Sequence, residues 1–329
     1  MGPSRTGDAM RTIAVLNQKG GVGKTTTVAN TAAALAAMGS KVVAVDLDPQ
    51  AHLTIHLGVE PQAVRSGSYA VLINEARFEQ EILLSRLNLW LLPANIDLVG
   101  AESELVSVVG RETILREAIQ PVQDRFDYCF IDCAPSLGLL TLNALAAAQE
   151  VLIPLQPHFL ALQGFGKLLQ TIDLVNKRIN PSLSVRGILL CMFDRRALLP
   201  HEVKADIERF LSKARGTDSA WAQAQILPVY VRRNIKLAEA PSYGQTIFEY
   251  EPNCHGAEDY KKVAELIRDA AGGRWGAEQA EPATRIESIP QSSHEAAPQP
   301  DSQTPVSEYT HIAKIEQGQN NTEAEQSDR

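Results

Sequence analysis

The sequence predicts a doubly wound α/β fold, in which a mostly parallel sheet carries helices on both faces. Residues 12–48 read as an apolar run, a glycine-rich loop, an alanine-rich helix and a second apolar run. Strands that are apolar at nearly every position indicate a parallel sheet covered on both sides. The chain has 329 residues, 44% of them hydrophobic, which is enough for a large buried core.

The same alternation continues along the chain. Further strands are predicted at residues 87–92, 128–132, 151–155 and 184–192. Helices are predicted near residues 137–148, 160–178, 201–213 and 257–271. Strands that alternate with helices in this way favour parallel pairing with crossover helices.

Composition divides the chain into three parts. The polar residues 1–10 are expected to be disordered, and residues 11–275 are expected to form the α/β domain. Residues 276–329 are rich in Glu, Gln, Ser and Pro and hold ten acidic against three basic residues. Such a segment cannot bury enough apolar surface to offset its ordering entropy, so we expect a disordered acidic tail.

Composition also limits the class of protein. No apolar stretch is long enough to span a bilayer and no signal peptide opens the sequence, so a cytoplasmic location is expected. The cysteines are scattered, which suggests neither a disulfide framework nor a zinc site. We expect them to be small buried apolar residues. They are Cys129, Cys133, Cys191 and Cys254.

The strongest motif lies between the first predicted strand and helix, where residues 18–26 read Gln-Lys-Gly-Gly-Val-Gly-Lys-Thr-Thr. Glycines let backbone N–H groups turn toward phosphate oxygens, Lys24 can reach the β- and γ-phosphates, and the Thr25 hydroxyl can bind Mg²⁺. The motif therefore predicts a P-loop. Its nucleotide contacts are expected at Lys19, Gly20, Gly21, Val22, Gly23, Lys24, Thr25 and Thr26. It departs from the usual pattern, because Gln18 replaces a glycine and an extra lysine follows it.

Carboxylates end two other predicted strands. Asp46 and Asp48 follow the apolar run at 42–45, and Asp132 ends the run at 128–131. Because ligands bind at the carboxyl ends of strands in open α/β sheets, these residues are expected beside the P-loop. Asp132 is predicted to hold Mg²⁺ through water, with Asp46 supporting the metal shell.

The run Lys-Gly-Gly-Val-Gly-Lys-Thr-Thr resembles the deviant Walker A motif of the ParA/MinD superfamily, and residues 11–271 resemble the ParA/Soj partition ATPases. The resemblance implies that Lys19 reaches phosphates bound by the partner subunit in an ATP-dependent homodimer. It also implies that Asp48 orients or activates the attacking water. The expected catalytic residues are thus Asp48, Lys19 and Lys24.

The same resemblance implies that Asn234 contacts the adenine, and Gln50 is also assigned to the nucleotide. Family members usually read Pro-Arg-Asn where this chain has Arg232, Arg233 and Asn234. Cys191 likewise stands where relatives often carry threonine or asparagine. These departures leave the shape of the base pocket open.

Charge distribution bears on a nucleic-acid partner. The formal net charge is −8, but residues 195–236 hold nine basic against four acidic residues. Dimers of the resembled family bind double-stranded DNA without sequence preference, and a basic region would neutralise phosphates. Charge alone fits a solvated helix face equally well. The expected DNA surface comprises Arg195, Arg196, Lys204, Arg209, Arg232, Arg233 and Lys236.

The resemblance as a whole implies a nucleoid-associated partition ATPase that uses ATP and Mg²⁺ and is stimulated by a ParB-like protein. The alternative is a positioning or regulatory ATPase that moves a protein cargo over the nucleoid. A MinD-like membrane role is disfavoured because the C-terminal segment is acidic rather than a basic amphipathic helix. No cysteine arrangement indicates the iron–sulfur cluster of nitrogenase iron proteins.

Overall fold

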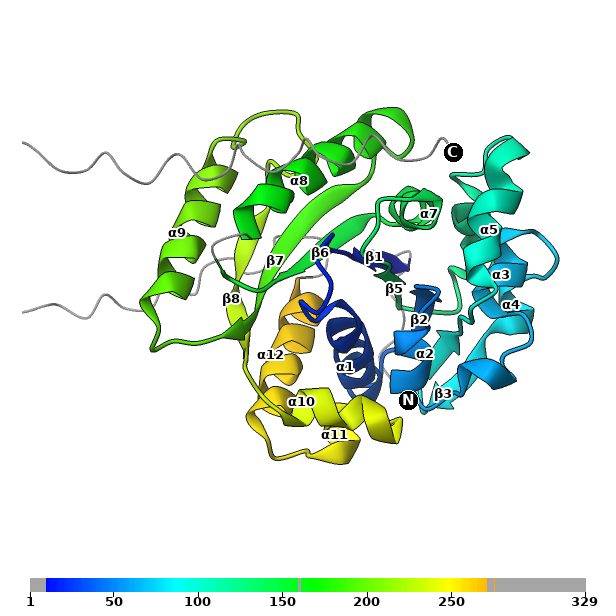
Figure 1. The fold of residues 1–329 in the computed structure, drawn as a ribbon, viewed down its shortest axis with the longest axis horizontal. Coiled ribbons are helices and arrows are strands. Elements are labelled where there is room, and N and C mark those ends of the chain that lie inside the picture. Colours follow the sequence, from blue (N-terminus) through cyan, green and yellow to red (C-terminus); the bar gives the residue numbers. More distant parts are fainter. Residues whose placement is uncertain (1–9, 159–160, 271–274, 276–329) are drawn as a thin grey trace, which may run out of the picture. The chain divides into compact units, whose positions relative to one another are not determined.

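An eight-stranded sheet forms the centre of the computed structural model, which describes residues 10–158, 161–270 and 275 (Figure 1). The strands lie in the order β3-β4-β2-β5-β1-β6-β7-β8. All neighbours pair in parallel except β3 and β4. The strands are β1 (Arg11–Val15), β2 (Val42–Leu47), β3 (Leu83–Arg86), β4 (Leu89–Leu92), β5 (Tyr128–Cys133), β6 (Glu150–Leu155), β7 (Ser184–Phe193) and β8 (Gln225–Arg232).

Helices cover both faces of this sheet (Figure 1). One face packs against α3 (Gly67–Leu72), α4 (Phe78–Glu81), α5 (Leu98–Glu104), α6 (Ile114–Ile119), α7 (Leu139–Ala147), α8 (Ala161–Arg178) and α9 (Leu198–Ser212). The other face packs against α1 (Lys24–Ala37), α2 (His52–His56), α10 (Lys236–Glu239), α11 (Ile247–Tyr250) and α12 (His255–Asp269). Short 3-10 turns lie at Pro61–Ala63, Leu105–Ser107, Gln120–Val122 and Ala240–Tyr243.

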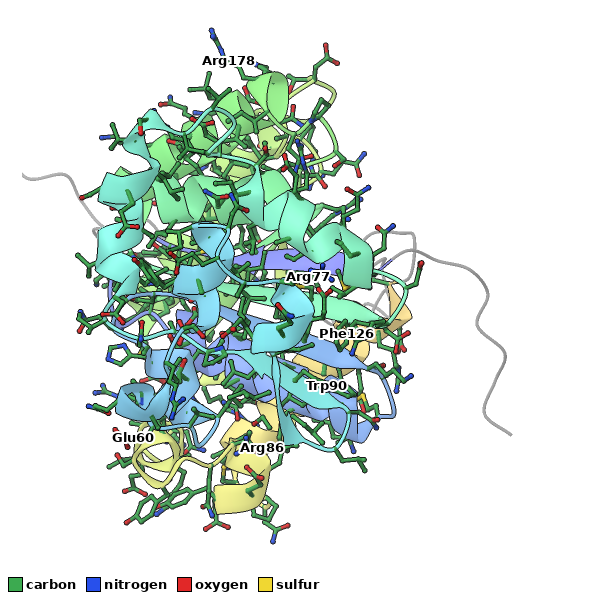
Figure 2. All side chains as sticks on the ribbon, turned by 90° about the vertical axis from the view of Figure 1, so that its right-hand side faces the viewer. Glu60, Arg77, Arg86, Trp90, Phe126 and Arg178 are labelled. Atoms are coloured by element: carbon green, nitrogen blue, oxygen red, sulfur yellow. The ribbon has the colours of Figure 1, made fainter. Side chains whose placement is uncertain are left out.

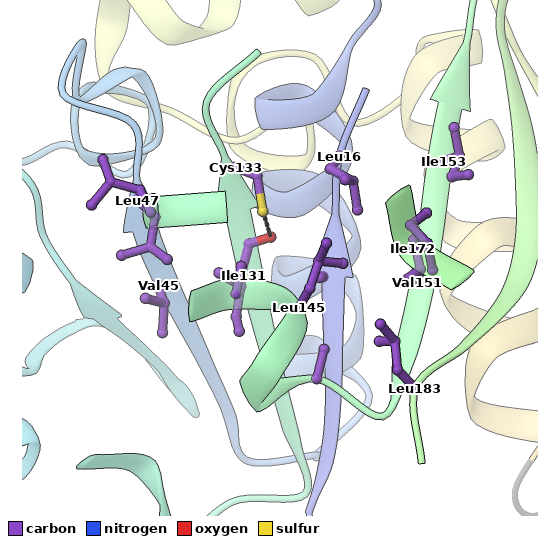
Figure 3. Close-up of a cluster of buried hydrophobic side chains, with 14 of the residues drawn as sticks. Leu16, Val45, Leu47, Ile131, Cys133, Leu145, Val151, Ile153, Ile172 and Leu183 are labelled. Carbon is purple, nitrogen blue, oxygen red and sulfur yellow. Dashed lines mark hydrogen bonds between the residues drawn. The ribbon is translucent and has the colours of Figure 1, made fainter. Parts of the chain in front are cut away.

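The central strands explain why the sheet needs cover on both sides. In β2, Val43, Val45 and Leu47 belong to one hydrophobic cluster, and Val42 and Ala44 belong to the other. Alternate side chains of a strand point to opposite faces, so an all-apolar strand must bury both. Figure 3 shows the first cluster, in which β2, β5, β1 and β6 present their side chains together.

The fold class is therefore confirmed, and the structure extends the predicted elements at both edges of the sheet. The sequence predicted a strand at 87–92, but β4 begins at Leu89 and is preceded by the antiparallel strand β3. β8 was missed because its burial is irregular and Pro228 interrupts it. Figure 2 faces the β3 side, where Trp90 and Phe126 pack edge to face with ring centroids 5.3 Å apart.

The remaining boundary predictions concern the chain ends and the cysteines. Residues 1–9 and 276–329, predicted to be disordered, lie outside the described residues, whereas Met10 is buried. Three cysteines are buried as predicted, and Cys254 is half-buried. Within the described part of the chain, no helix combines the length and the apolar character needed to cross a membrane.

Gly67 offers a test of the fold, because it has a φ of 59° and an added Cβ would lie 2.2 Å from the carbonyl oxygen of Pro93. Gly67→Ala should lower the free energy of unfolding by roughly 2 to 5 kcal/mol, from left-handed strain plus this clash. Gly39→Ala is the matched control, since Gly39 has a φ of 96° with nothing within 4 Å. It should cost about 1 kcal/mol. Equal losses in urea unfolding would contradict the packing at Gly67.

Candidate active site

The loop between β1 and α1 has the geometry of an anion-binding site. Gly21 and Gly23 have φ of 72° and 96°, in the left-handed region that favours glycine. Gly23 is the N-cap of α1, and no side chain of the described residues caps that helix end. Backbone N–H groups and the positive end of the helix dipole therefore face the loop, as in protein phosphate sites. Val22 is buried, and the Thr26 carbonyl accepts a hydrogen bond from Asn30.

Lys24 opens α1 and is only 7% exposed. Its Nζ lies 3.4 Å from the carbonyl oxygen of Lys19, so the ammonium group is folded back over the loop. Among the described residues it forms no ion pair with a carboxylate. The carboxylate of Asp132 attracts this ammonium group from beyond ion-pair distance, and an anion held by the loop would stabilise the nearly buried cation further.

Asp132 stands at the carboxyl end of β5, directly across from the start of α1. The Thr25 hydroxyl donates a 2.6 Å hydrogen bond to Asp132 Oδ2. Oδ1 is buried and has no hydrogen-bond partner in the described structure. Burial, and next the nearby Asp46, raise the pKa of Asp132 well above its usual value. A hydroxyl beside a carboxylate with one unbonded oxygen is a donor set that fits Mg²⁺.

Asp46 pairs in register with Asp132 across β2 and β5, so the structure brings the two predicted metal residues together. Its own oxygens are used within the chain. Oδ2 accepts hydrogen bonds from the Thr54 amide at 2.9 Å and the Thr54 hydroxyl at 2.7 Å, and Oδ1 accepts one from the Asp48 amide at 3.1 Å. Burial raises the pKa of Asp46 to about 6. Asp46 thus shapes the turn after β2 and anchors α2 at the site.

Asp48 lies in the turn that follows β2 and is 8% exposed. Its Oδ1 accepts a hydrogen bond from the amide of Gln50 at 3.0 Å, and its carbonyl accepts one from Ala51 at 2.8 Å. These bonds fix the turn. They leave Oδ2 without a hydrogen bond among the described residues, so that oxygen can accept a proton or hold a water.

Lys19 differs from Lys24 in that its side chain is exposed. Its amide donates to Asn17 Oδ1 at 3.0 Å, and Asn17 Nδ2 donates to the Pro154 carbonyl at 2.7 Å. The Lys19 ammonium meets Nε2 of His158. Partial burial and Lys19 lower the pKa of His158, which favours the neutral ring that can accept this hydrogen bond. Lys19 therefore extends from the loop toward the surface.

Comparisons with known proteins agree with this geometry. Residues 10–185 match the AAA domain family. The chain is 44% identical to the chromosome partitioning protein ParA of Myxococcus xanthus, over 76% of this chain and 85% of that protein. It is 41% identical to the sporulation initiation inhibitor protein Soj of Bacillus subtilis, over 79% of this chain and 98% of that protein. The chain belongs to the ParA/Soj family of P-loop ATPases.

Solved structures extend the likeness to the fold. Cobyrinic acid a,c-diamide synthase from Mycobacterium smegmatis, with bound ATP analog and magnesium, is 36% identical with a TM-score of 0.67. The alignment covers 80% of this chain and 96% of that one. MinD from Pyrococcus horikoshii, complexed with Mg-ADP, is 25% identical with a TM-score of 0.62, covering 80% of this chain and 98% of that one.

The opposite side of the loop in this ParA/Soj family member is built by β7 and β8. A Cβ added to Gly23 would lie 3.7 Å from the Cys191 sulfur, so Cys191 packs directly against the P-loop. Burial raises the pKa of this thiol to about 12. Asn234 follows β8, and its side-chain oxygen accepts a hydrogen bond from the Lys236 amide at 2.9 Å. The structure thus places Asn234 in a formed turn.

The basic residues predicted to bind DNA fall into two groups. Four of them pair with carboxylates: Lys204 with Glu208, Arg209 with Asp206, Arg232 with Asp259 and Glu258, and Lys236 with Glu239. Arg195, Arg196 and Arg233 form no ion pair within the described ranges, and Arg195 lies over the Tyr230 ring at 6.0 Å. The basic surface is therefore smaller than the count of charges suggested.

Several residues of the site were not singled out from the sequence. Thr54 holds Asp46, Asn17 ties the P-loop to β6, and His158 meets Lys19. Each acts across 8 or more residues of sequence or through a backbone atom, and none belongs to a motif. Only the spacing of Thr54 after the Asp46 strand end, at the start of a short helix, could have indicated its role.

Asp132→Asn tests the buried carboxylate. Burial raises the pKa of Asp132 in the folded chain, so the folded chain holds a proton that the unfolded chain releases. Its stability therefore falls as pH rises from the unfolded pKa of about 3.9 toward the raised folded pKa. The amide should therefore raise the stability of the nucleotide-free protein at about pH 7.5 by about 1 to 3 kcal/mol. At about pH 5 the gain should shrink.

Thermal unfolding at the two pH values, with and without magnesium and ATP, measures this effect. The exposed Asp218→Asn should change neither melting temperature, and Asp132→Asn should lose the added stabilisation by magnesium. A lower melting temperature for nucleotide-free Asp132→Asn at neutral pH would show that the carboxylate is already well stabilised by its own chain.

Proposed function

We propose that this chain is an ATP-dependent dimer switch for the partition of chromosomal or plasmid DNA. The observation that carries the proposal is the contrast between two lysines of one loop. Lys24 is nearly buried over the loop, whereas Lys19 is exposed and its ammonium group meets His158. A cation that reaches phosphate only across a subunit interface gives the dimer extra affinity for ATP, and such differential affinity is what shifts an equilibrium.

The other residues of the site would bind the metal ion, bind the phosphates or position the attacking water. Thr25 and the unbonded Oδ1 of Asp132 would hold Mg²⁺, which when bound neutralises charge on the β- and γ-phosphates. Lys24 and the amides of the loop bind the phosphates. Asp48, held in place through Oδ1, orients the attacking water with its other oxygen. Gln50, exposed in the same turn, would contact the nucleotide.

The ATP dimer would bind double-stranded DNA on the nucleoid without sequence preference, and hydrolysis would release it. Pairing two subunits doubles the number of cations that meet one DNA, and affinity rises steeply with that number. The relative from Myxococcus xanthus, which is named as a chromosome partitioning protein, supports this role. A ParB-like partner would stimulate hydrolysis. A partner that is instead a cargo protein would make the chain a positioning ATPase of the same kind.

Three alanine variants test the switch by sedimentation velocity with magnesium and ATP. Lys24→Ala should lose ATP binding by 100-fold or more, on the order expected for a lost phosphate contact in a dry site. Lys19→Ala should bind ATP as a monomer. Asp48→Ala should bind ATP and stay dimeric, with hydrolysis reduced by roughly 100-fold or more.

Lys41→Ala is the matched control, since this exposed lysine precedes β2 at the amino end of the sheet. It should dimerise like the unaltered protein. One oligomeric state with ATP, with ADP and without nucleotide would rule out the switch. Unchanged turnover in Asp48→Ala would remove the role given to this carboxylate.

DNA binding is tested on the three members of the predicted DNA surface that form no ion pair in the described structure. Arg195→Glu, Arg196→Glu and Arg233→Glu together should abolish ATP-dependent retention of DNA in a gel shift, because three attractive contacts per subunit become repulsive. Arg178→Glu, an exposed reversal at the end of α8, serves as the control. If the triple variant retained DNA as well as the control, the DNA surface would lie elsewhere.

A further inference from the structure

The end of β8 lies beside the P-loop, although the two are more than 200 residues apart in sequence. Cys191 on β7 packs against Gly23, and it pairs in register with Val231 on β8. Neighbouring strands are about 4.8 Å apart. The chain that leaves β8 after Val231 therefore borders the nucleotide site on the side away from Asp46 and Asp132, which belong to β2 and β5 (Figure 1).

A buried carboxylate on α12 fastens this end of β8. Asp259 is 4% exposed and receives hydrogen bonds from both the backbone and the side chain of Arg232. The Arg232 amide donates to Oδ2 at 2.9 Å, Nε donates at 3.0 Å, and Nη2 donates to Oδ1 at 2.6 Å. Glu258 accepts a further bond from Nη2 at 2.7 Å. We call these contacts the Arg232–Asp259 clasp.

The same turn of α12 also reaches the helix that follows the P-loop. Tyr260, the residue after Asp259, is buried with its hydroxyl 3.2 Å from that of Thr27 on α1. Adjacent residues of α12 thus contact both α1 and the end of β8. Since α12 packs on both elements, it fixes their spacing.

The clasp is continuous with the turn that carries Asn234. Two residues beyond Arg232, the Asn234 side chain accepts a bond from the Lys236 amide at 2.9 Å, and its carbonyl accepts one from Leu237 at 3.3 Å. With its oxygen engaged, the side-chain amide nitrogen remains to donate to a ligand. The position of Asn234 depends on where β8 ends, because Arg232 is the last residue of that strand.

We propose that the Arg232–Asp259 clasp positions the 232–237 turn against the base of the bound nucleotide and so sets the preference of the site for adenine. The inference rests on the proposed ATP site. Arg232 and Asp259 are positioning residues that act through Asn234 and do not touch the nucleotide. A proline at 232 could not make the amide bond to Asp259, so this chain fixes its turn by a contact that a Pro-Arg-Asn sequence lacks.

Asp259→Asn tests the proposal, because an amide of the same shape removes the charge and half of the accepting capacity. Binding of ATP, GTP and inorganic tripolyphosphate is measured by calorimetry with magnesium. The variant should bind ATP roughly tenfold more weakly, as expected when a contact group is misplaced by a fraction of an ångström. GTP should weaken less, which lowers the ATP-to-GTP ratio, and tripolyphosphate should bind unchanged because the P-loop is intact.

Arg232→Gln is the milder second variant and keeps the backbone bond to Asp259, so its loss should be smaller but of the same pattern. Lys261→Ala is the control, since Lys261 is an exposed lysine of the same helix that forms no hydrogen bond or ion pair with the clasp. Equal weakening of ATP and tripolyphosphate, or an unchanged ATP-to-GTP ratio in folded Asp259→Asn, would overturn the clasp's role. Failure of the unaltered protein to bind ATP through Lys24 would instead overturn the proposed function.

Discussion

The arrangement of the rest of the site depends on two fully buried carboxylates at one edge of the sheet. Asp46 and Asp132 pair in register across β2 and β5, and burial raises the pKa of both. Their surroundings differ in one respect. Asp46 is held by three hydrogen bonds from its own chain, whereas Asp132 has one from Thr25 and keeps a bare oxygen. A buried carboxylate oxygen without a hydrogen bond destabilises the folded chain, and a cation bound to that oxygen would remove this free-energy cost most simply.

The elements around this pair serve to hold it in place. Thr54 bonds Asp46 and also accepts the Ala94 amide, so α2 is fixed to the chain after β4. Arg86 on β3 reaches the Leu57 and Gly244 carbonyls and forms an ion pair with Glu249. The edge strand that sequence analysis missed therefore connects α2 to the elements near α11. Residues that belong to none of the sequence motifs therefore hold both sides of the nucleotide site in place.

How much was predictable from sequence follows from how local each signal is. The P-loop, β1, β2 and β5 are encoded in short runs whose residue types alone specify the backbone and the charge, so Lys24, Thr25 and Asp132 were placed correctly beside one another. β3 and β8 lie at the sheet edges, where exposure breaks the apolar pattern. The Arg232–Asp259 and Lys19–His158 contacts join residues 27 and 139 positions apart. No periodicity or spacing rule reports a contact of that kind.

The number of basic residues in 195–236 overstates the basic surface for the same reason: the sequence does not show which of them pair with carboxylates. Counting nine basic residues over 195–236 treats each as free, yet helical neighbours three or four positions apart neutralise Lys204, Arg209 and Lys236. Arg232 turns inward to a buried carboxylate. Of the seven residues predicted to bind DNA, Arg195 and Arg196 just after β7 and Arg233 after β8 remain exposed and form no ion pair in the described structure. Because both strands end at the edge of the sheet that carries the P-loop, any DNA surface these residues form lies at the nucleotide-binding edge, where dimerisation would also occur. Under the proposed function, DNA binding and dimerisation would then take place at the same edge of the sheet, so ATP would control the first through the second.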